Sequence, residues 1–352
     1  FGSPNKSAKA SSHGSPLGSD EVNLTRIKLS WSEKPFQIPE KLLKIWRGSA
    51  DKNKKLYKKS KSTFHSNLTK KDIDKLFNKI ELDLKNFNSD QATRKSSEAI
   101  LNYIKEDHPI LGGSADLTGS NNTKGKEMSV MNSKNMSGQY IHYGVREHGM
   151  AAIMNGIAAT KIYKTYSGTF LSFADYMKPS LRLAALMKID PIQVFTHDSI
   201  GLGEDGPTHQ PIEQINMLRL IPNSYVFRPC DLKETIVCWK EALKIDNAPS
   251  FICLSRQNLP QISNKKLVSK NFKGAYVISG PKKNNDITII ATGSEVSLAV
   301  NIAEVLINNG IIAKVISMPS SSIFEKQSRS FKITLLNSKF CLLYTSDAAD
   351  DA

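Results

Sequence analysis

DITIIATGSEVSLAVNIAEVLINNGIIAKVISMP, residues 286–319, is the stretch that indicates the fold class most directly. It holds two short apolar runs, separated by a Gly-Ser turn and a long segment whose apolar residues recur at three- and four-residue spacing. This order predicts a strand, a turn, a helix and a second strand, the unit from which parallel sheets are built. We therefore expect an α/β domain over residues 275–340, after a polar linker at 264–274.

The same alternation fills residues 89–262. Short apolar runs typical of buried strands, such as PIQVFTH at 191–197, alternate with amphipathic helices, such as DLKETIVCWKEALKI at 231–245. The segment PTHQPIEQINMLRLI, residues 207–221, is expected to be a helix, because a helix tolerates proline in its first turn and Pro207 stands near its start. We expect a doubly wound α/β fold, in which helices cover both faces of a parallel sheet.

The two ends of the chain depart from this pattern. Residues 1–88 indicate a loop and then a helix-rich connector, since apolar residues recur at helical spacing in IPEKLLKIW (38–46) and TKKDIDKLFNKIELDL (69–84). Residues 341–352, CLLYTSDAADDA, leave the strand–helix pattern for a small acidic tail of doubtful origin. We assign no function to that tail.

The composition excludes few classes of protein. With 39% hydrophobic and 23% charged residues, the 352-residue chain is typical of a soluble globular protein, and no apolar run approaches the ~20 residues of a bilayer span. The sequence starts without a methionine or an apolar signal, so we interpret the start as internal and expect targeting information to lie outside it. Four cysteines without zinc-like spacing favour a reducing, cytoplasmic compartment.

The formal charge of +15 raises the question of a nucleic-acid partner. Much of the excess lies in stretches such as DKNKKLYKKSK, residues 51–61, with six lysines and one aspartate. Lysines without interleaved arginines and stacking aromatic residues favour a solvated face, and an anionic substrate would use the same positive field. We expect neither a nucleic acid nor a membrane as partner.

Four polar clusters follow predicted strands: GGSADLTGSNNT at 112–123, YGVREHGM at 143–150, THDSIGLGEDGPTHQP at 196–211 and LSRQN at 254–258. Ligands of open α/β sheets bind beyond the carboxyl ends of the strands. The spacing of these clusters therefore predicts a functional site at one edge of the sheet.

Individual residues in these clusters allow two interpretations each. Glu147 suits a carboxylate stabilised by a helix dipole, or a partly buried acid that exchanges a proton with a ligand nitrogen. His197, Asp205 and His209 suit acid–base work around a hydroxylated substrate better than a zinc site, because the histidines stand twelve residues apart. No metal ligands are expected among them.

The remaining candidates fall into two groups: residues that could bind phosphate, and aromatic residues whose spacing is typical of a hydrophobic core. Arg94 and Arg256 offer guanidinium groups and Ser120 a hydroxyl donor, although each arginine taken singly suits the surface. Phe170, Phe173 and Tyr176 recur at a spacing of three, which is more typical of core packing than of a cofactor platform.

Taken in order, YIHYGVREHGM, GGSADLTGSN, HDSIGLGEDGPTHQP and LSRQNLP are similar to stretches of the transketolase family, and the resemblance runs from residue 1 to about 340. Transketolases are thiamine-diphosphate enzymes of the pentose phosphate pathway that transfer a two-carbon ketol unit from a ketose phosphate to an aldose phosphate. The resemblance implies that residues 1–88 are the tail of the diphosphate-binding domain with the connector. It implies a pyrimidine-binding domain at 89–262 and a truncated C-terminal domain at 275–340.

The resemblance assigns cofactor-binding roles to five residues. Glu147 matches the carboxylate that hydrogen-bonds the cofactor's pyrimidine nitrogen and so activates the thiazolium ring. Phe170, Phe173 and Tyr176 match an aromatic pocket around the pyrimidine, with Phe173 as the stacking partner, which reverses the core interpretation. Asp116 matches a carboxylate near the cofactor at the subunit interface.

Further matches concern the substrate. His13, in HGSPLG, matches a histidine near the thiazolium, and His209 matches a partner in proton transfer; with Glu147 they form the implied catalytic set, and both also contact substrate. Asp205 matches the residue that contacts the sugar's α-hydroxyl. The implied phosphate binders are Arg94, Ser120, His197 and Arg256.

One departure from the family is informative. The Gly-Asp-Gly…Asn motif that holds the diphosphate and its Mg²⁺ is absent, so the metal ligands are expected in a part of the first domain outside this sequence. In the family the cofactor lies between the first domain of one subunit and the pyrimidine domain of the other, which implies a homodimer. We therefore expect this polypeptide alone to have little or no activity.

Alternatives remain open. The implied substrates are xylulose 5-phosphate, ribose 5-phosphate and erythrose 4-phosphate, but dihydroxyacetone synthase shares nearly all these motifs. Deoxyxylulose-phosphate synthase shares an Asp-Gly-x-Thr-His loop. A non-catalytic fragment that retains only the fold is the alternative outside the enzymes.

Overall fold

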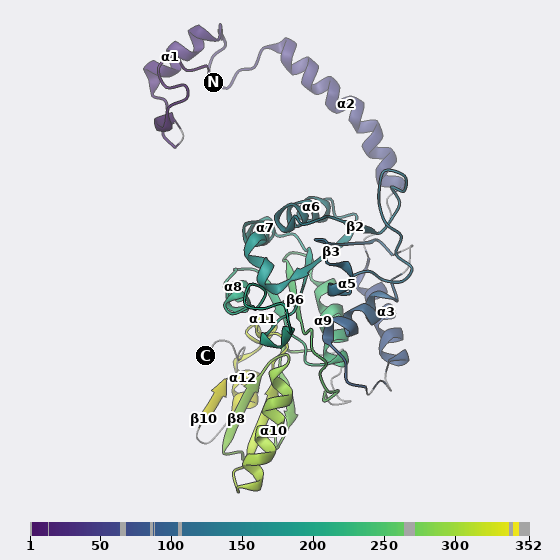
Figure 1. The fold of residues 1–352 in the computed structure, drawn as a ribbon. Coiled ribbons are helices and arrows are strands. Elements are labelled where there is room, and N and C mark those ends of the chain that lie inside the picture. Colours follow the sequence, from purple (N-terminus) through teal and green to yellow (C-terminus); the bar gives the residue numbers. More distant parts are fainter. Residues whose placement is uncertain are drawn as a thin grey trace. The chain divides into compact units, whose positions relative to one another are not determined.

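The structure is a computed structural model that describes residues 2–12, 14–63, 68–84, 87, 89–104, 108–263, 272–337 and 341–344. The chain divides into two compact units, residues 1–65 and 66–352, and each is considered by itself (Figure 1). No helix of the described residues combines the length and the apolar character that a membrane span requires.

The first unit is helical in the residues described. It contains the short 3-10 helix η1 (Ala10–Ser12) and the helices α1 (Ser19–Lys28) and α2 (Glu40–Thr63). The carboxylate of Glu21 in α1 accepts hydrogen bonds from the main-chain and side-chain nitrogens of Asn5, at 2.8 and 2.9 Å, which ties the N-terminal segment to the helix. The helix-rich character predicted for this segment is confirmed.

The second unit contains a six-stranded sheet. Its order is β2-β1-β3-β4-β6-β5, and all neighbouring strands pair in parallel. The strands are β1 (Ile110–Ser114), β2 (Tyr140–His142), β3 (Lys164–Phe170), β4 (Ile192–Thr196), β5 (Tyr225–Phe227) and β6 (Ser250–Leu254). The predicted parallel sheet is confirmed.

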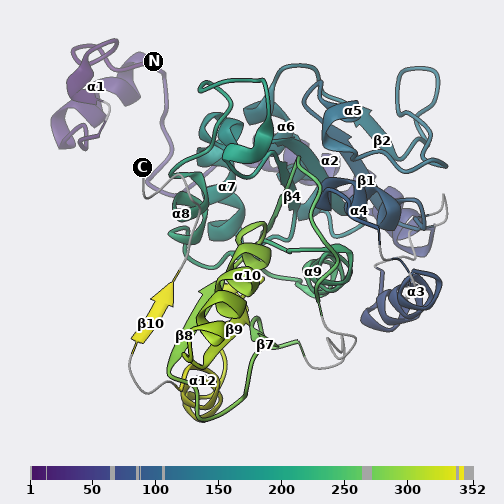
Figure 2. The same cartoon turned by 60° about the horizontal axis from the view of Figure 1, so that its bottom comes forward.

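Both faces of this sheet are covered, because successive side chains of a strand point to opposite faces. In β4, Ile192 and Val194 join one buried cluster, whereas Phe195 joins the other. The first cluster includes residues of α3 (Lys70–Asp83), α4 (Thr93–Leu101) and α9 (Leu232–Lys244). The second includes residues of α6 (Glu147–Ala159), α7 (Ala174–Met187) and α8 (Gln214–Arg219), and Figures 1 and 2 show α7 and α9 on opposite sides of the strands. This arrangement confirms the doubly wound α/β fold.

The helix predicted at 207–221 is wrong in its first half. The α8 helix begins at Gln214, and the residues from Gly203 to Glu213 form turns and irregular backbone. A second proline at position 211 explains the difference, because the residue before a proline is disfavoured in the helical region. His209 therefore lies in a turn.

The C-terminal part of this unit forms a four-stranded sheet with order β10-β8-β9-β7. The predicted βαβ unit is present as β8 (Ile287–Ala291), α10 (Glu295–Asn308) and β9 (Ala313–Ser317), with β8 and β9 parallel. The remaining elements are β7 (Tyr276–Ser279), which pairs antiparallel with β9, α11 (Ser321–Phe324), α12 (Arg329–Leu336) and β10 (Cys341–Tyr344).

The strand β10 differs from the expectation for the tail. Cys341–Tyr344 pairs in parallel with β8, so the sheet continues into the first four tail residues. An apolar four-residue segment can occupy the otherwise open edge of β8, which satisfies main-chain groups of both strands. Residues 345–352 lie outside the described residues.

Candidate functional site

Polar and aromatic residues collect at the carboxyl edge of the six-stranded sheet. Phe170 ends β3, His197 directly follows β4, and Ser255 and Arg256 directly follow β6. Because these strands are parallel and adjacent in the order β3-β4-β6, their carboxyl ends meet at one edge. The structure thus places two of the four predicted polar clusters, those at 196–211 and 254–258, side by side at this edge, next to Phe170.

Five aromatic rings form a connected cluster at this edge. The His197 ring stacks on Phe170 with centroids 3.7 Å apart, and Phe170 stacks on Phe173 at 5.7 Å. His209 presents its ring edgewise to Phe170 and to Phe173, at 5.9 and 5.1 Å. Tyr176 lies against Phe173 at 6.0 Å and is 66% exposed.

This cluster is more than core packing. Phe170 is buried, whereas Phe173, in the 3-10 helix η2 (Leu171–Phe173), is half-buried and Tyr176 is exposed. Two partly accessible aromatic faces beside two imidazoles suit a flat heteroaromatic ligand, since offset aromatic contacts stabilise such rings.

His197 is held in an unusual conformation. Its φ is +60°, in the left-handed region, and only 4% of the residue is exposed. Its Nδ1 lies 2.9 Å from the hydroxyl of Thr196, and that hydroxyl donates a hydrogen bond to Oδ1 of Asn121 at 2.7 Å. Burial, followed by the charges of Arg94, Arg256 and His209, lowers the pKa of His197 to about 3. The imidazole is therefore neutral at physiological pH.

Two arginines converge near this imidazole. Arg94, the second residue of α4, donates from Nη1 to the main-chain oxygen of Ser120 in α5 (Thr118–Asn121), while its Nε is buried without a hydrogen-bond partner. Burial, and next the charge of Arg256, lowers the pKa of Arg94. At Gly203 an added Cβ would stand 3.1 Å from Cζ of Arg256, so glycine leaves room for that guanidinium. Like charges held together in this way suit an anionic ligand such as phosphate.

The glycine-rich loop supplies the remaining groups. His209 is half-buried, and its Nδ1 lies 2.8 Å from the hydroxyl of Thr208. Asp205 is exposed, and its charge acts on Arg94. The structure therefore brings Arg94, Arg256, His197, His209 and Asp205 into one electrostatic neighbourhood.

Two predicted site residues have no contact with this cluster. Glu147 is the first residue of α6 and is 8% exposed, and among the described residues none forms a hydrogen bond or ion pair with its carboxylate. Asp116 follows β1, has φ +61° and is exposed. The carbonyl of Ser120 contacts Arg94, but its hydroxyl has no such contact. His13 lies outside the described residues.

The groups gathered at this edge have the chemistry of an anion and polyol site. The described residues contain no group of three or more His, Cys, Asp or Glu side chains that could hold a metal ion. A buried acid without a partner, accessible aromatic faces and two arginines fit a heteroaromatic cofactor together with a phosphorylated, hydroxylated substrate.

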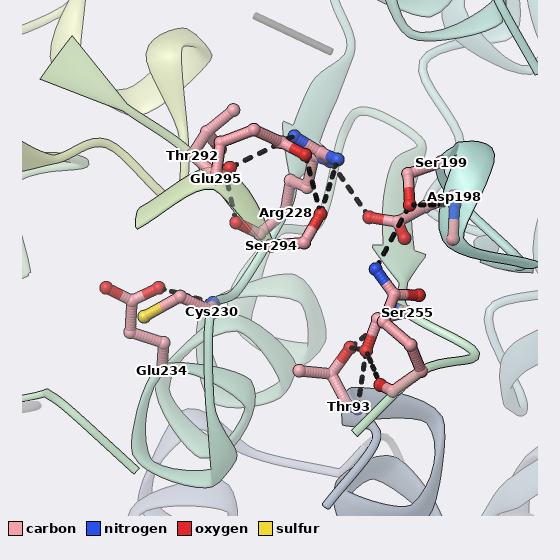
Figure 3. A network of polar contacts seen from close by, with 12 residues as sticks. Thr93, Asp198, Ser199, Arg228, Cys230, Glu234, Ser255, Thr292, Ser294 and Glu295 are labelled. Atoms are coloured by element: carbon pink, nitrogen blue, oxygen red, sulfur yellow. Dashed lines mark hydrogen bonds and ion pairs between the residues drawn. The ribbon is translucent and has the colours of Figure 1, made fainter. Parts of the chain in front are cut away.

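Sequence reasoning missed three residues that shape this edge. Arg228, directly after β5, binds the carboxylate of Asp198, the residue after His197 (Figure 3). Thr196 and Asn121 orient the imidazole of His197. The signal for Arg228 was a charged residue at the end of an apolar strand, in SYVFRPC.

Three family models match the chain. Residues 89–261 match the pyrimidine-binding domain of transketolase, residues 274–351 a transketolase-like C-terminal domain, and residues 1–81 the thiamine-diphosphate-binding domain of transketolase. Together these matches extend over almost the whole chain.

Individual relatives agree with these matches. A transketolase of Buchnera aphidicola subsp. Baizongia pistaciae is 41% identical over 94% of this chain and 52% of the relative, and transketolase 2 of Escherichia coli K12 is 43% identical over 96% and 53%. A crystal structure of transketolase from Pichia stipitis with sedoheptulose-7-phosphate superposes with a TM-score of 0.81 at 37% identity, over 98% of this chain and 54% of that one. The chain thus spans about half the length of the curated relatives that it matches.

Proposed function

This chain belongs to the transketolase family, and from that premise we propose that it forms part of an enzyme that transfers a two-carbon ketol unit between sugar phosphates. The observation that carries the proposal is the meeting of His197, His209, Arg94 and Arg256 beside partly accessible aromatic rings at one sheet edge. An anion site, a proton-transfer group and a ring platform are what this reaction requires of the protein.

We propose that the cofactor is thiamine diphosphate and that its pyrimidine ring is held by Glu147, Phe173, Phe170 and Tyr176. Glu147 is buried and has no hydrogen-bond or ion-pair partner among the residues that the structure describes, so its carboxylate is available to a ring nitrogen. The half-buried face of Phe173 offers a surface on which such a ring can stack. When bound, thiamine diphosphate supplies the carbanion chemistry, and the protein sets the protonation of its ring.

Asp116 and the metal belong to the same proposal. Asp116, exposed beyond β1, would face the cofactor at a subunit interface. Mg²⁺ would accompany the diphosphate and take its ligands from the family's diphosphate-binding domain rather than from this edge.

The phosphate end of the sugar would bind to the arginines. Guanidinium groups of Arg94 and Arg256 can bind phosphate oxygens in pairs, with Ser120 and His197 beside them. Solved relatives hold sedoheptulose-7-phosphate and fructose-6-phosphate. We propose the same class for this protein, with xylulose 5-phosphate as donor and ribose 5-phosphate or erythrose 4-phosphate as acceptor.

The loop would handle the sugar hydroxyls and their protons. His209 touches the aromatic platform edgewise, so its free nitrogen can exchange a proton with a substrate held there. Asp205 would hold the α-hydroxyl, and His13, which lies outside the described residues, would take part in the same proton transfers.

The assembly would be a homodimer in the cytoplasm. Helices α6 and α7 expose Ile153, Leu183, Leu186 and Met187 by 50% or more each, an apolar surface that a second subunit can cover. Cys230, Cys238 and Cys253 are buried free thiols, which suits a reducing compartment.

An assay of the complete protein tests the function. With thiamine diphosphate and Mg²⁺, xylulose 5-phosphate and ribose 5-phosphate should yield sedoheptulose 7-phosphate and glyceraldehyde 3-phosphate. Formaldehyde as the preferred acceptor would indicate dihydroxyacetone synthase instead, and pyruvate as the donor would indicate deoxyxylulose-phosphate synthase. No turnover of any of these substrates would contradict the proposal and favour a non-catalytic protein.

A further inference from the structure

Arg228 joins the two sheets of the second unit. It directly follows β5 and is 1% exposed. Its main-chain N–H donates to the oxygen of Pro319 at 2.8 Å, and its carbonyl oxygen accepts from Gly293 N at 3.1 Å and from the hydroxyl of Thr292 at 3.2 Å. The C-terminal part of the chain thus holds the backbone of Arg228 from two sides.

The guanidinium of Arg228 extends this connection to the substrate loop (Figure 3). Its Nε donates to Oδ2 of Asp198 at 2.8 Å, directly after His197. On the other side, Nη1 donates to the carbonyl of Thr292 at 3.0 Å and to the carboxylate of Glu295, and Nη2 donates to Ser294 Oγ at 3.2 Å. The rigid fork of one arginine therefore links the turn at 292–295 to the start of the loop at 197–209.

Two features favour arginine at position 228: the buried carboxylates on either side of its guanidinium, and the close approach of the turn that contains Gly293. Asp198 is 1% exposed, and burial raises its pKa, opposed by the charge of Arg228. Without the guanidinium, Asp198 and Glu295 would be two buried acids without a compensating cation. At Gly293, φ is +56° and an added Cβ would stand 2.8 Å from Cγ of Arg228, so the turn approaches this closely only with glycine.

The link continues toward the phosphate-binding groups. The hydroxyl of Ser199 accepts hydrogen bonds from Nε2 of Gln257 at 3.1 Å and from Gly201 N at 3.3 Å. Gln257 is the neighbour of Arg256, and Asp198 is the neighbour of His197. The first residues of the loop are therefore anchored at Asp198 to Arg228 and at Ser199 to the segment that carries Arg256.

We propose that Arg228 is a positioning residue through which the turn at 292–295 fixes the loop at 197–209 in the conformation that binds the phosphate-bearing sugar. Arg228 does not touch the substrate itself. The C-terminal sheet thereby acts on sugar-phosphate binding, although it contributes no ligand. This inference rests on the proposed function for its substrate, and on the contacts of Arg228 for its geometry.

Two variants of the complete protein test the proposal. Arg228→Lys keeps the charge but loses the fork, and Glu295→Gln weakens only the C-terminal side. Both should raise the KM for the sugar-phosphate donor, Arg228→Lys by on the order of tenfold, because a small displacement of positioned groups weakens binding strongly. The affinity for thiamine diphosphate should stay within about threefold, because Glu147 and Phe173 lie outside the loop that Arg228 anchors, whereas kcat can fall together with substrate binding because that loop carries His209.

A matched control is Tyr276→Phe. It removes the hydrogen bond from Tyr276 to Glu234, 2.8 Å long, which also connects the C-terminal sheet to α9 but does not reach the loop. This variant should leave the KM unchanged. If the control raises the KM as much as Arg228→Lys does, a general loosening of the two sheets explains the effect and the proposal is wrong.

A second measurement does not depend on activity. With ¹⁵N-histidine labelling of the complete protein, the ring signals of His197, assigned with a His197→Asn variant, should shift in Arg228→Lys and Glu295→Gln but not in Tyr276→Phe. Unshifted signals, or a native KM in both folded variants, overturn the proposal; if Arg228→Lys does not fold, Glu295→Gln decides alone. If the unmodified protein does not catalyse ketol transfer, that result contradicts the proposed function only. The NMR signals of His197 then test the positioning role of Arg228.

Discussion

Two buried polar regions of the second unit contrast in how their groups are satisfied. Beside the C-terminal sheet, Asp231 accepts hydrogen bonds from Glu234 N, Ser263 N, Ser263 Oγ and Ile262 N, at 3.0, 2.6, 2.8 and 3.1 Å. Glu234 accepts from Cys230 N and Tyr276 Oη, both at 2.8 Å, and from Ser317. Both carboxylates are fully occupied by protein donors.

The carboxyl edge of the six-stranded sheet is different. The carboxylate of Glu147 has no protein partner among the described residues, and Nε of Arg94 is buried without one. A buried polar atom without a hydrogen bond costs about 1–3 kcal/mol, and some described atoms elsewhere, such as Nε2 of Gln261 in the first region, also lack a partner. The contrast therefore concerns the carboxylates: those of Asp231 and Glu234 are bound by the fold, whereas that of Glu147 is available to a ligand.

The largest effect that would sharpen this contrast is expected at Glu147. Glu147→Gln in the complete protein should lower kcat for ketol transfer by ~100-fold or more, because the amide cannot share a proton with the cofactor ring as a carboxyl can. The unfolding midpoint should hardly change, since no described residue bonds to the carboxylate. Steady-state kinetics measures the change in kcat, and thermal unfolding measures the change in the unfolding midpoint.

A matched comparison is Asp231→Asn, which changes a fully buried acid to its amide in the satisfied region. It should lose stability, by about 2 kcal/mol, while the folded protein keeps its kcat, because an amide nitrogen meets donors where the carboxylate had accepted. Full activity of Glu147→Gln, or a loss of activity in folded Asp231→Asn, would break the distinction between the two regions.

A smaller effect concerns pH and Glu234. Burial and the neighbouring Asp231 raise its pKa from 4.5 to about 7 in the folded protein. Between these values the folded state binds the proton that the unfolded state has released, so this contribution to stability is present below about pH 4.5 and is lost as the pH rises to 7. Urea unfolding should show about 2 kcal/mol less stability at pH 7 than at pH 5 from this group.

The Glu234→Gln variant isolates that contribution. Its amide does not titrate, so the difference in unfolding free energy between wild type and variant should change with pH by the same ~2 kcal/mol. A difference that stays constant from pH 5 to 7 would show that the three donors hold Glu234 ionised throughout, and the satisfied region would then be insensitive to pH.

Much of the fold follows from local patterns in the sequence. Alternation of period two in PIQVFTH places Ile192 and Val194 on one face and Phe195 on the other, which is enough to predict a sheet covered on both sides. Local patterns failed where two signals competed. Pro207 suits a helix start, but Pro211 prevents one before Gln214.

The site could be predicted only in part, for a different reason. The positions of His197 and Arg256 at strand ends predict one edge, because parallel strands share their direction. That Phe170 stacks on His197 depends on the register of β3 against β4, and the role of Arg228 depends on Thr292, 64 residues further along the chain. No local pattern contains such contacts.

The smallest effect is expected at His197. Its pKa reports on the carboxyl edge of the six-stranded sheet and can be measured without an activity assay. Burial first, and then the charges of Arg94, Arg256 and His209, lower its pKa from 6.5 to about 3. Between pH 6.5 and 3 the imidazole is protonated in the unfolded state but neutral in the folded state. The contribution of His197 to the free energy of unfolding is therefore complete above pH 6.5 and is lost as the pH falls toward 3. Between pH 7 and 5.5 the loss should be about 1 kcal/mol.

Histidine NMR of the 352-residue chain checks this directly. The ring of His197 should stay neutral from pH 8 to 5, because burial, and next the charges of the two arginines, disfavour a further positive charge there. Inorganic phosphate offsets those arginine charges, so its addition should raise the pKa of His197, whereas chloride at equal ionic strength should raise it less. A ring that titrates near pH 6.5 with no response to phosphate would mean that His197 is exposed and that Arg94 and Arg256 do not form an anion site.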